Sequence, residues 1–321
     1  MSYLDYPHRN YGNDHSLYDW SYSARREPVR LDDGTKVSAF ITVPLEFFPL
    51  NPSGKPFKHP GAMVTPYPDL RHYTTRDYGN RVGVFRLLKV LEAAGIKAVV
   101  PANAAIVERY PSLIKRIADA GHEIAAHGVS TDHIHYDGLT EAQENDYISQ
   151  TLAAFSKLGI VPTTWMSPAR NQSYRTVDLL AKHGLSVCLD WEMDQRPVTM
   201  TTPSGAVTGL PNHFELNDFN LLLTKRQSED AWRDQIVEAG AFLASEYKRF
   251  GSQVFGFTLT PYITGLPFRT LAVQEAIEGL QAVDGLKIQT AGEIVKAWSG
   301  QVPSAEKGEL VTARTTQGGA D

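Results

Sequence analysis

The chain has 321 residues, and 42% of them are hydrophobic, which is sufficient for one large core. Its formal net charge of -5 and the lack of a Lys/Arg-rich run argue against nucleic acid or an anionic membrane surface as a partner. The N-terminus lacks the apolar stretch of a signal peptide and no long apolar segment follows, so a soluble, cytoplasmic protein that contacts no membrane is expected.

Residues 1–35 form the first distinct segment, because their many aromatic residues follow neither helical nor strand periodicity. We predict an extended N-terminal arm that lies on the rest of the chain or on a neighbouring subunit, since either contact would cover these side chains. A homo-oligomer is expected on this basis. At the other end, residues 302–321 are polar and without aromatic residues, which predicts a disordered tail.

Between these segments, residues 36–301 alternate apolar, strand-like stretches with stretches of helical periodicity. Strands are predicted in chain order at 40–48, 97–103, 122–128, 161–168, 185–191, 253–261 and 286–290. Helices are predicted between and after them at 82–95, 110–121, 140–159, 175–184, 228–251, 270–285 and 293–300. About seven strand–helix units in a chain of this length are typical of an α/β fold built as a parallel barrel.

Polar and aromatic side chains lie at or just after the ends of several predicted strands. In a parallel barrel, the carboxyl ends of the strands form the edge where active sites are built. The residues at these positions are Glu46, His127, Arg170, Asp190, Trp191 and Thr260. The sequence therefore predicts a functional site at this edge.

Residues 123–135 contain three histidines, His127, His133 and His135. They are six and two positions apart, whereas two metal ligands on one helical face are three or four apart. His127 follows a predicted strand directly. His133 and His135 come after Gly128 in a polar loop, so we expect both side chains on the solvated surface.

Two long segments resemble motifs of the polysaccharide deacetylase family, whose NodB-type domain is a deformed (β/α) barrel. AIVERYPSLIKRIADAGHEIAAHG, residues 105–128, is similar to the helix and strand that lead to the second motif of the family. SPARNQSYRTVDLLAKHGLSVCLDW, residues 167–191, is similar to the third and fourth motifs in order. The resemblance covers residues 36–301, and it implies a deformed parallel barrel with a hydrolytic site.

Within that family, residues 76–98 and the segments DW-x-x-D and ELND resemble the branch of PuuE-type allantoinases and related hydrolases of small cyclic amides. In this branch a glutamate replaces the paired aspartates of the first motif, and Glu46 stands at the matching position. Three other positions depart from the metal-dependent members: Phe47, Thr131 and Thr260 stand where two metal ligands and a general-acid histidine are found. The resemblance therefore implies no tightly bound metal.

Glu46 is the predicted general base, because it follows an apolar segment and the rings of Phe47 and Phe48 would desolvate its carboxylate. The alternative is a structural ion pair with Arg81 or Arg76. His127 is predicted to act as an acid or to orient substrate, with metal ligation and core hydrogen bonding as alternatives. If a weakly bound divalent ion such as zinc is used, its ligands would be Glu46, His127 and one of His133 or His135.

The remaining candidates are assigned to orientation and substrate binding. Asp190 is the third catalytic candidate, since its carboxylate could orient catalytic groups or accept from a substrate N–H; rim packing is the alternative. Substrate contacts are predicted for Tyr78, Arg81, Arg170, Trp191 and Asp194, with Glu215 and Asn217 as weaker candidates. The guanidinium of Arg170 suits an oxyanion or a carboxylate, although an exposed loop arginine is nearly as consistent with the sequence.

Three functions fit these observations. The first is a hydrolase of a non-peptide C–N bond in a small cyclic amide, imide or ureide, in which Glu46 activates water. The second is a metal-dependent N-acetyl sugar deacetylase, which the residues at positions 47, 131 and 260 oppose. The third is a barrel that binds a small-molecule ligand without catalysis, which the absent general-acid histidine keeps open.

Overall fold

The fold is built on one long, mostly parallel sheet. The computed structural model describes residues 15–53 and 65–301. Its strands are β1 (Val37–Thr42), β2 (Val99–Ala102), β3 (Glu123–Ala126), β4 (Thr164–Trp165), β5 (Val187–Cys188), β6 (Val198–Thr202), β7 (Gly205–Gly209), β8 (Gln253–Thr258) and β9 (Leu286–Ile288). Their order is β6-β7-β5-β4-β3-β2-β1-β8, with β9 paired to β1; within the described residues, only the β6–β7 pairing is antiparallel.

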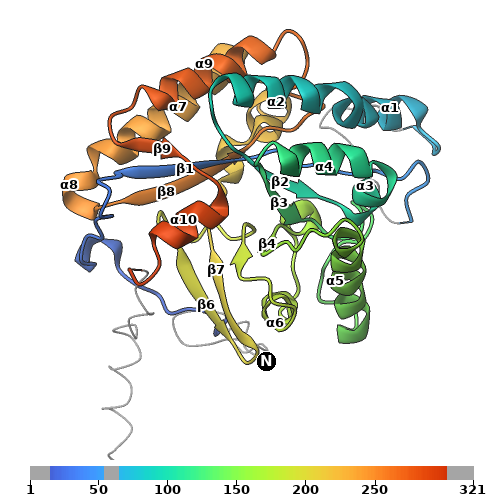
Figure 1. The fold of residues 1–321 in the computed structure, drawn as a ribbon, viewed down its shortest axis with the longest axis horizontal. Coiled ribbons are helices and arrows are strands. Elements are labelled where there is room, and N and C mark those ends of the chain that lie inside the picture. Colours follow the sequence, from blue (N-terminus) through green and yellow to red (C-terminus); the bar gives the residue numbers. More distant parts are fainter. Residues whose placement is uncertain (1–14, 54–64, 302–321) are drawn as a thin grey trace, which may run out of the picture.

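The sheet curls into a deformed barrel (Figure 1). After β7, Asn212 forms a parallel bridge with Gly256 of β8, so the two ends of the curled sheet come together. His213 continues this contact, because its N–H donates to the Gly256 carbonyl at 2.8 Å. The predicted α/β class and deformed parallel barrel are confirmed by this topology.

Helices cover the outside of the sheet (Figure 1). They are α1 (Leu70–Tyr78), α2 (Val84–Ala93), α3 (Ala104–Arg109), α4 (Pro111–Asp119), α5 (Glu141–Ser156), α6 (Thr176–Lys182), α7 (Glu229–Ser245), α8 (Tyr247–Phe250), α9 (Thr270–Gln281) and α10 (Ala291–Ala297). Short 3-10 turns are η1 (Ser23–Arg25), η3 (Pro168–Arg170) and η4 (Phe214–Leu216), and π-helical segments are η2 (Gly79–Gly83) and η5 (Phe219–Thr224).

Local chemistry explains where several helices begin and which face they bury. Thr140 caps α5 in a capping box with Gln143, and Ser228 caps α7, so free N–H groups of both first turns are satisfied. Pro111 begins α4, where its missing N–H costs no hydrogen bond. The buried face of α2 matches the predicted apolar stripe and consists of Val84, Leu87, Leu88 and Leu91.

The β6–β7 hairpin and the π-helical segments were not predicted. The hairpin joins two strands around the turn at Pro203 and Ser204, and most residues of β6 are only partly buried. Such strands lack the apolar run or clean alternation that marks a strand in sequence. The extra residue of a π-helical turn likewise leaves no distinct sequence pattern.

The described part of the predicted N-terminal arm, residues 15–35, lies against the barrel. The Leu17 carbonyl accepts a hydrogen bond of 2.8 Å from the N–H of Thr201 in β6. Farther along, Val29 forms a parallel bridge with Gly251, just before β8. Residues 1–14 of the arm and the predicted tail, residues 302–321, lie outside the described residues. The division into an arm (1–35), a barrel (36–301) and a tail (302–321) stays a prediction.

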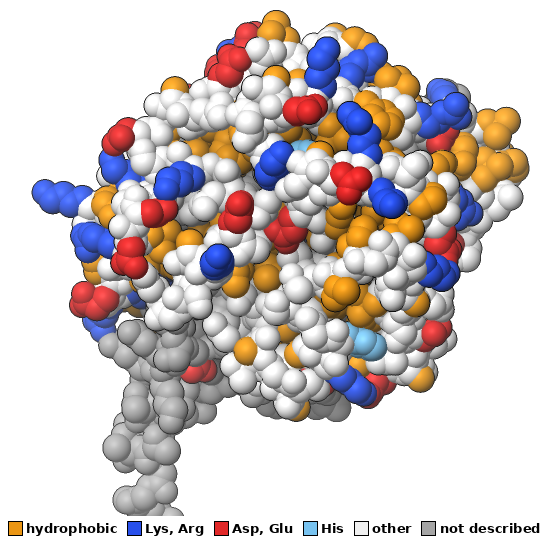
Figure 2. All heavy atoms as spheres, in the orientation of Figure 1, with side chains coloured by type: hydrophobic (Ala, Val, Ile, Leu, Met, Phe, Trp, Pro, Cys, Tyr) orange, Lys and Arg blue, Asp and Glu red, His pale blue; other side chains and the backbone are white. Residues whose placement is uncertain are grey.

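The surface agrees with the modest net charge. On the face shown in Figure 2, Lys and Arg side chains are interspersed with Asp and Glu side chains and with apolar patches. This face therefore presents a mixed surface instead of the basic field that attracts nucleic acid. Within residues 15–53 and 65–301, no helix combines the length and apolar character needed to cross a membrane.

Candidate functional site

A cavity of about 660 Å³ lies at the edge of the barrel formed by the carboxyl ends of the strands. Segments that follow β1, β3, β4 and β8 contribute to its wall, as expected for a parallel barrel. Its lining includes Glu46, Arg76, His127, Arg170, Thr260 and Tyr262. Three of the site residues predicted from the sequence, Glu46, His127 and Arg170, therefore share one cavity.

Glu46 and His127 form the central pair of this cavity. Their nearest side-chain atoms, Oε1 and Nε2, are 3.6 Å apart; the His127 side chain is 1% exposed and that of Glu46 is 20% exposed. The Nδ1 atom of His127 lies 2.6 Å from the carbonyl of Met166. A carbonyl can only accept, so Nδ1 carries a proton and a neutral His127 presents the lone pair of Nε2 toward Glu46.

Asn103, at the end of β2, holds the backbone of both residues in place. Its Oδ1 accepts from the N–H of Phe47 at 2.8 Å, and its Nδ2 donates to the carbonyl of His127. The side chain is fully buried, so these bonds are shielded from water. Sequence reasoning missed Asn103, although an asparagine that closes the apolar segment KAVVPAN was a usable signal.

Arg76, not Arg81, is the arginine near Glu46. The Arg76 guanidinium is 4.3 Å from the Phe48 ring centroid and 5.7 Å from that of Tyr262. Burial lowers the pKa of Arg76, whereas the nearby Tyr262 hydroxyl and the charge of Glu46 raise it. The Arg81 side chain is 72% exposed and 3.6 Å from Asp77, so the structure does not bring it to the cavity.

Arg170 reaches the cavity from a loop with unusual backbone geometry. Ala169 and Arg170 have φ angles of 55° and 54°, a left-handed conformation that costs free energy in residues with a Cβ and often occurs at functional sites. Nη2 of Arg170 lies 2.7 Å from the Glu192 carboxylate and 3.2 Å from the Asp190 carbonyl. Its Nε and Nη1 are buried and have no hydrogen-bond partner among the described residues.

The Asp190 side chain has a structural role. Its carboxylate accepts from the N–H of Ser167 at 2.9 and 3.1 Å and from Nε2 of Gln172 at 2.6 Å. Asp190 is absent from the cavity lining. It therefore holds the loop that carries Arg170 and has no direct contact with the Glu46–His127 pair among the described hydrogen bonds.

Two further substrate-binding candidates, Trp191 and Asp194, face the N-terminal arm. Nε1 of Trp191 donates to Oε1 of Gln172 at 2.8 Å, and its ring lies edge-on to Tyr18 with centroids 6.1 Å apart. Asp194 forms an ion pair of 2.5 Å with Arg26. Neither residue lines the cavity, because the arm occupies the surface that each presents.

Tyr78 also lies away from the cavity, and its hydroxyl accepts a hydrogen bond from Arg86. Of the weaker candidates, Glu215 is exposed and pairs with Lys225. Asn217 does line the cavity, and its Oδ1 accepts from the N–H of Thr258 at 2.9 Å. Asn217 thereby joins the loop after β7 to the end of β8.

The prediction of a solvated surface position is wrong for His135, which is fully buried. Its Nδ1 lies 3.1 Å from Oε1 of Glu144 in α5, and its ring packs edge-on against Trp165 with centroids 5.4 Å apart. His133 is half-buried, and its Nδ1 lies 2.7 Å from the Ser130 hydroxyl. Burial lowers the pKa of His133. Neither histidine lines the cavity that holds Glu46.

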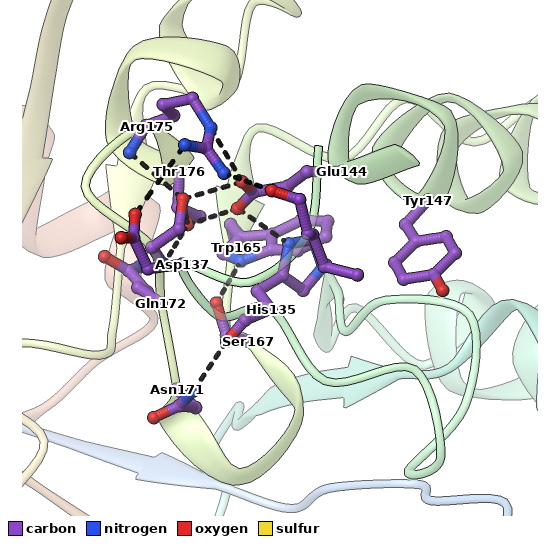
Figure 3. A network of polar contacts seen from close by, with 12 residues as sticks. His135, Asp137, Glu144, Tyr147, Trp165, Ser167, Asn171, Gln172, Arg175 and Thr176 are labelled. Carbon is purple, nitrogen blue, oxygen red and sulfur yellow. Dashed lines mark hydrogen bonds and ion pairs between the residues drawn. The ribbon is translucent and has the colours of Figure 1, made fainter. Parts of the chain in front are cut away.

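Glu144 is the centre of the buried polar network in Figure 3. Its carboxylate accepts from the hydroxyls of Ser173 at 2.6 Å and Thr176 at 2.5 Å, and it lies 3.7 Å from Nε of Arg175. Together with His135, these contacts join the loop after β3 to the loop after β4. These loops follow His127 and carry Arg170, so the network supports both walls of the site.

The donor set does not fit a tightly bound metal ion. Catalytic zinc sites use three protein ligands and one water molecule. Of the expected ligands, only Glu46 and His127 come together, and the Thr131 hydroxyl donates to the Phe47 carbonyl at 2.9 Å. Across residues 15–53 and 65–301, no group of three His, Cys, Asp or Glu side chains could hold a metal ion.

Asp218 is a second buried carboxylate next to the cavity, and the sequence did not single it out. It accepts from the N–H of Thr260 at 2.6 Å and from the hydroxyls of Thr260 and Thr264 at 2.8 Å. Burial raises the pKa of Asp218 to about 7, against the lowering effect of these hydrogen bonds. Asp218 therefore positions Thr260, which lines the cavity.

We predict a pH-dependent contribution of Asp218 to stability. An unfolded aspartate loses its proton near pH 4, whereas folded Asp218 keeps it until about pH 7, so this contribution falls as pH rises through that window. In Asp218→Asn the contribution disappears. The difference in free energy of unfolding between variant and wild type should change by about 3 kcal/mol from pH 4.5 to 8, measured by urea denaturation. A difference that stays constant with pH would contradict the assignment.

Comparisons with known proteins agree with this architecture. The polysaccharide deacetylase family model matches residues 67–188. A Helicobacter pylori protein named peptidoglycan deacetylase is 24% identical over 254 residues, which are 68% of this chain and 84% of that protein. A Gibberella zeae protein named as peptidoglycan deacetylase-like is 32% identical over 120 residues, 36% of this chain and 34% of its own.

Solved structures share the fold. A crystal structure from Mycobacterium smegmatis has a TM-score of 0.73 and 21% identity, and covers 88% of this chain and 96% of its own. The crystal structure of PuuE allantoinase has a TM-score of 0.71 and 21% identity, with 92% of this chain and 98% of its own covered. The chain is therefore similar to the polysaccharide deacetylase family over residues 67–188, and it shares its fold with these solved structures.

Proposed function

We propose that the protein is a hydrolase of non-peptide C–N bonds and that its substrate is a small cyclic amide, imide or ureide. The observation that carries this proposal is the Glu46–His127 pair, 3.6 Å apart in a largely apolar cavity, without a third metal ligand among the described residues. A carboxylate in such surroundings suits general-base catalysis. The PuuE allantoinase neighbour, which shares this fold, supports the same chemistry.

The proposed reaction needs only side chains of the cavity. Glu46 takes a proton from a water molecule, whose oxygen attacks the carbonyl carbon of the ring. The oxyanion that forms accepts a hydrogen bond from an arginine, and Arg170, whose side chain lines the cavity, is the candidate for this role. When the C–N bond breaks, the proton held by Glu46 passes to the ring nitrogen, directly or through Nε2 of His127. Water is consumed, and the product is one open-chain molecule that carries a carboxylic acid and an amine, amide or urea nitrogen.

The test is a panel of hydantoin, succinimide, dihydrouracil, allantoin and an N-acetylglucosamine oligomer, each incubated with protein purified without added metal. We expect opening of at least one ring, at a rate unchanged by a chelator, and no release of acetate. Elemental analysis should find no stoichiometric divalent ion. Acetate release that stops on chelation would instead support the metal-dependent deacetylase, the activity named for the Helicobacter pylori relative.

We also propose that the protein is a homo-oligomer whose interface includes the N-terminal arm. Within the arm, Trp20 and Tyr22 are 48% and 49% exposed and stack on each other, with centroids 6.2 Å apart. Exposed paired aromatic rings of this kind are typical of interfaces. Deleting residues 1–22 should reduce the mass measured by light scattering. A monomer both before and after the deletion would contradict the proposal.

A further inference from the structure

The cavity is much larger than the ring that its catalytic pair would open. A five-membered cyclic imide or ureide has about seven non-hydrogen atoms, and at about 30 Å³ each, the share of one water molecule in the liquid, it fills about 210 Å³. The cavity measures about 660 Å³, a volume typical of sites for larger ligands. Space for a sizeable substituent therefore remains beside the ring.

The walls of that space are largely apolar. Apolar and aromatic side chains that line the cavity include Phe48, Ile134, Met166, Phe214, Phe219 and Tyr262. Phe214 begins η4 at the rim and is 45% exposed. Covering an exposed aromatic ring at the mouth of a cavity with an apolar group is favourable, because it removes apolar surface from water.

Glu192 contacts both Arg170 and the backbone of Phe214, the exposed aromatic residue of the rim. Its Oε1 lies 2.7 Å from Nη2 of Arg170, and the same oxygen accepts from the N–H of Phe214 at 2.9 Å. The Arg170 guanidinium and the Phe214 backbone therefore share one carboxylate oxygen, and both residues line the cavity. A ligand whose carbonyl oxygen binds Arg170 would have its neighbouring substituent on the side of the cavity where Phe214 lies.

We propose that the substrate ring carries an apolar substituent, branched alkyl or aryl, on the carbon next to the bound carbonyl. This inference rests on the proposed ring-opening function. The preference for an apolar substituent can nevertheless be measured as ligand binding, without catalysis. Burial of a group the size of a leucine side chain favours binding by about 10- to 150-fold. A polar substituent of equal size gains no such advantage against these walls.

The experiment compares 5-isobutylhydantoin with allantoin, which carries a ureido group of the same number of non-hydrogen atoms on the same ring carbon. Unsubstituted hydantoin is the reference. Binding is measured by isothermal titration calorimetry and ring opening by chromatography. We expect 5-isobutylhydantoin to bind at least about 10-fold more tightly than allantoin, with a matching ratio of kcat/KM.

Two variants test where the preference arises. Phe214→Ala should reduce the binding ratio between the isobutyl compound and allantoin by at least about 3-fold, because the rim contact is lost. Phe242→Ala, at a phenylalanine of α7 that is 63% exposed and outside the cavity lining, should leave the ratio unchanged. An equal fall in both variants would contradict the role of Phe214.

The outcomes separate the two proposals. Preferential binding of 5-isobutylhydantoin without ring opening would overturn the proposed hydrolysis and support the inferred ligand class. Ring opening with equal kcat/KM for all three compounds, or with allantoin preferred, would overturn the inferred class and leave the hydrolytic function standing. Failure of 5-isobutylhydantoin to bind at millimolar concentration would also overturn the inference.

Discussion

Glu46→Gln is expected to lower turnover of a ring-opened substrate about 10²- to 10⁴-fold, because the amide keeps the shape of the side chain but cannot accept the proton of the attacking water. The Glu46 side chain is 20% exposed and borders the cavity. The loss of its charge should therefore cost little stability, and Tm should stay close to that of the wild type. Turnover is measured by chromatography and Tm by circular dichroism on the same preparations.

The alternative structural role of Glu46 predicts the opposite pair of results. If Glu46 mainly balances the buried charge of Arg76, its neutralisation removes the opposing charge at a cost of about 3–5 kcal/mol, and Tm falls while turnover persists. Glu108→Gln is the matched control, since Glu108 is 52% exposed and pairs with Lys157 outside this cavity. That control should change neither quantity. Retained turnover in Glu46→Gln would exclude Glu46 as the general base and make His127 the next candidate.

Glu144→Ala is expected to lower the free energy of unfolding by about 3–5 kcal/mol, because it removes the carboxylate at the centre of a buried, hydrogen-bonded network. The carboxylate and the His135 ring are both fully buried, 3.1 Å apart. Without Glu144, the hydroxyls of Ser173 and Thr176 also lose their acceptor. Urea denaturation at pH 7 measures the change.

The effect of this substitution should depend on pH in a defined direction. Burial raises the pKa of Glu144, but hydrogen bonds from His135, Ser173 and Thr176 oppose it and leave the pKa below its ordinary value. The stabilisation is therefore present at neutral pH and is lost as pH falls through the folded pKa. Glu141→Ala on the exposed side of the same helix is the control and should cost less than about 1 kcal/mol. Equal losses in both variants would exclude a special role for the buried network.

The sequence by itself determined the architecture and the centre of the candidate site. Alternating apolar and helical periodicities report local burial directly, so seven strands and seven helices could be assigned from the chain. Parallel strands place their carboxyl ends on one edge, so residues that follow different strands could be assigned to a common site. For this reason Glu46, His127 and Arg170 could be predicted as site residues from the sequence, and in the structure they share one cavity.

Only the tertiary structure decided which polar side chains face that cavity. His135 looks like a loop residue in sequence, but Glu144 from α5 and Trp165 from β4 enclose it, and these partners are nine and thirty positions away. Asn103 likewise gains its positioning contacts from Phe47 and His127 on neighbouring segments. Periodicity reports whether a position is buried, but it carries no information about side chains that arrive from other parts of the chain.

The same limit applies to the arginines and to the loop that holds Arg170. Arg76 is the buried residue of α1 and lies by Glu46, whereas Arg81, in the π-helical segment η2, is 72% exposed. Asp190, at a strand end like Glu46, turns toward the backbone of Ser167 and supports the loop instead of lining the cavity. A strand end places a residue at the correct edge of the barrel, but the direction of its side chain depends on hydrogen-bond partners that tertiary contacts supply.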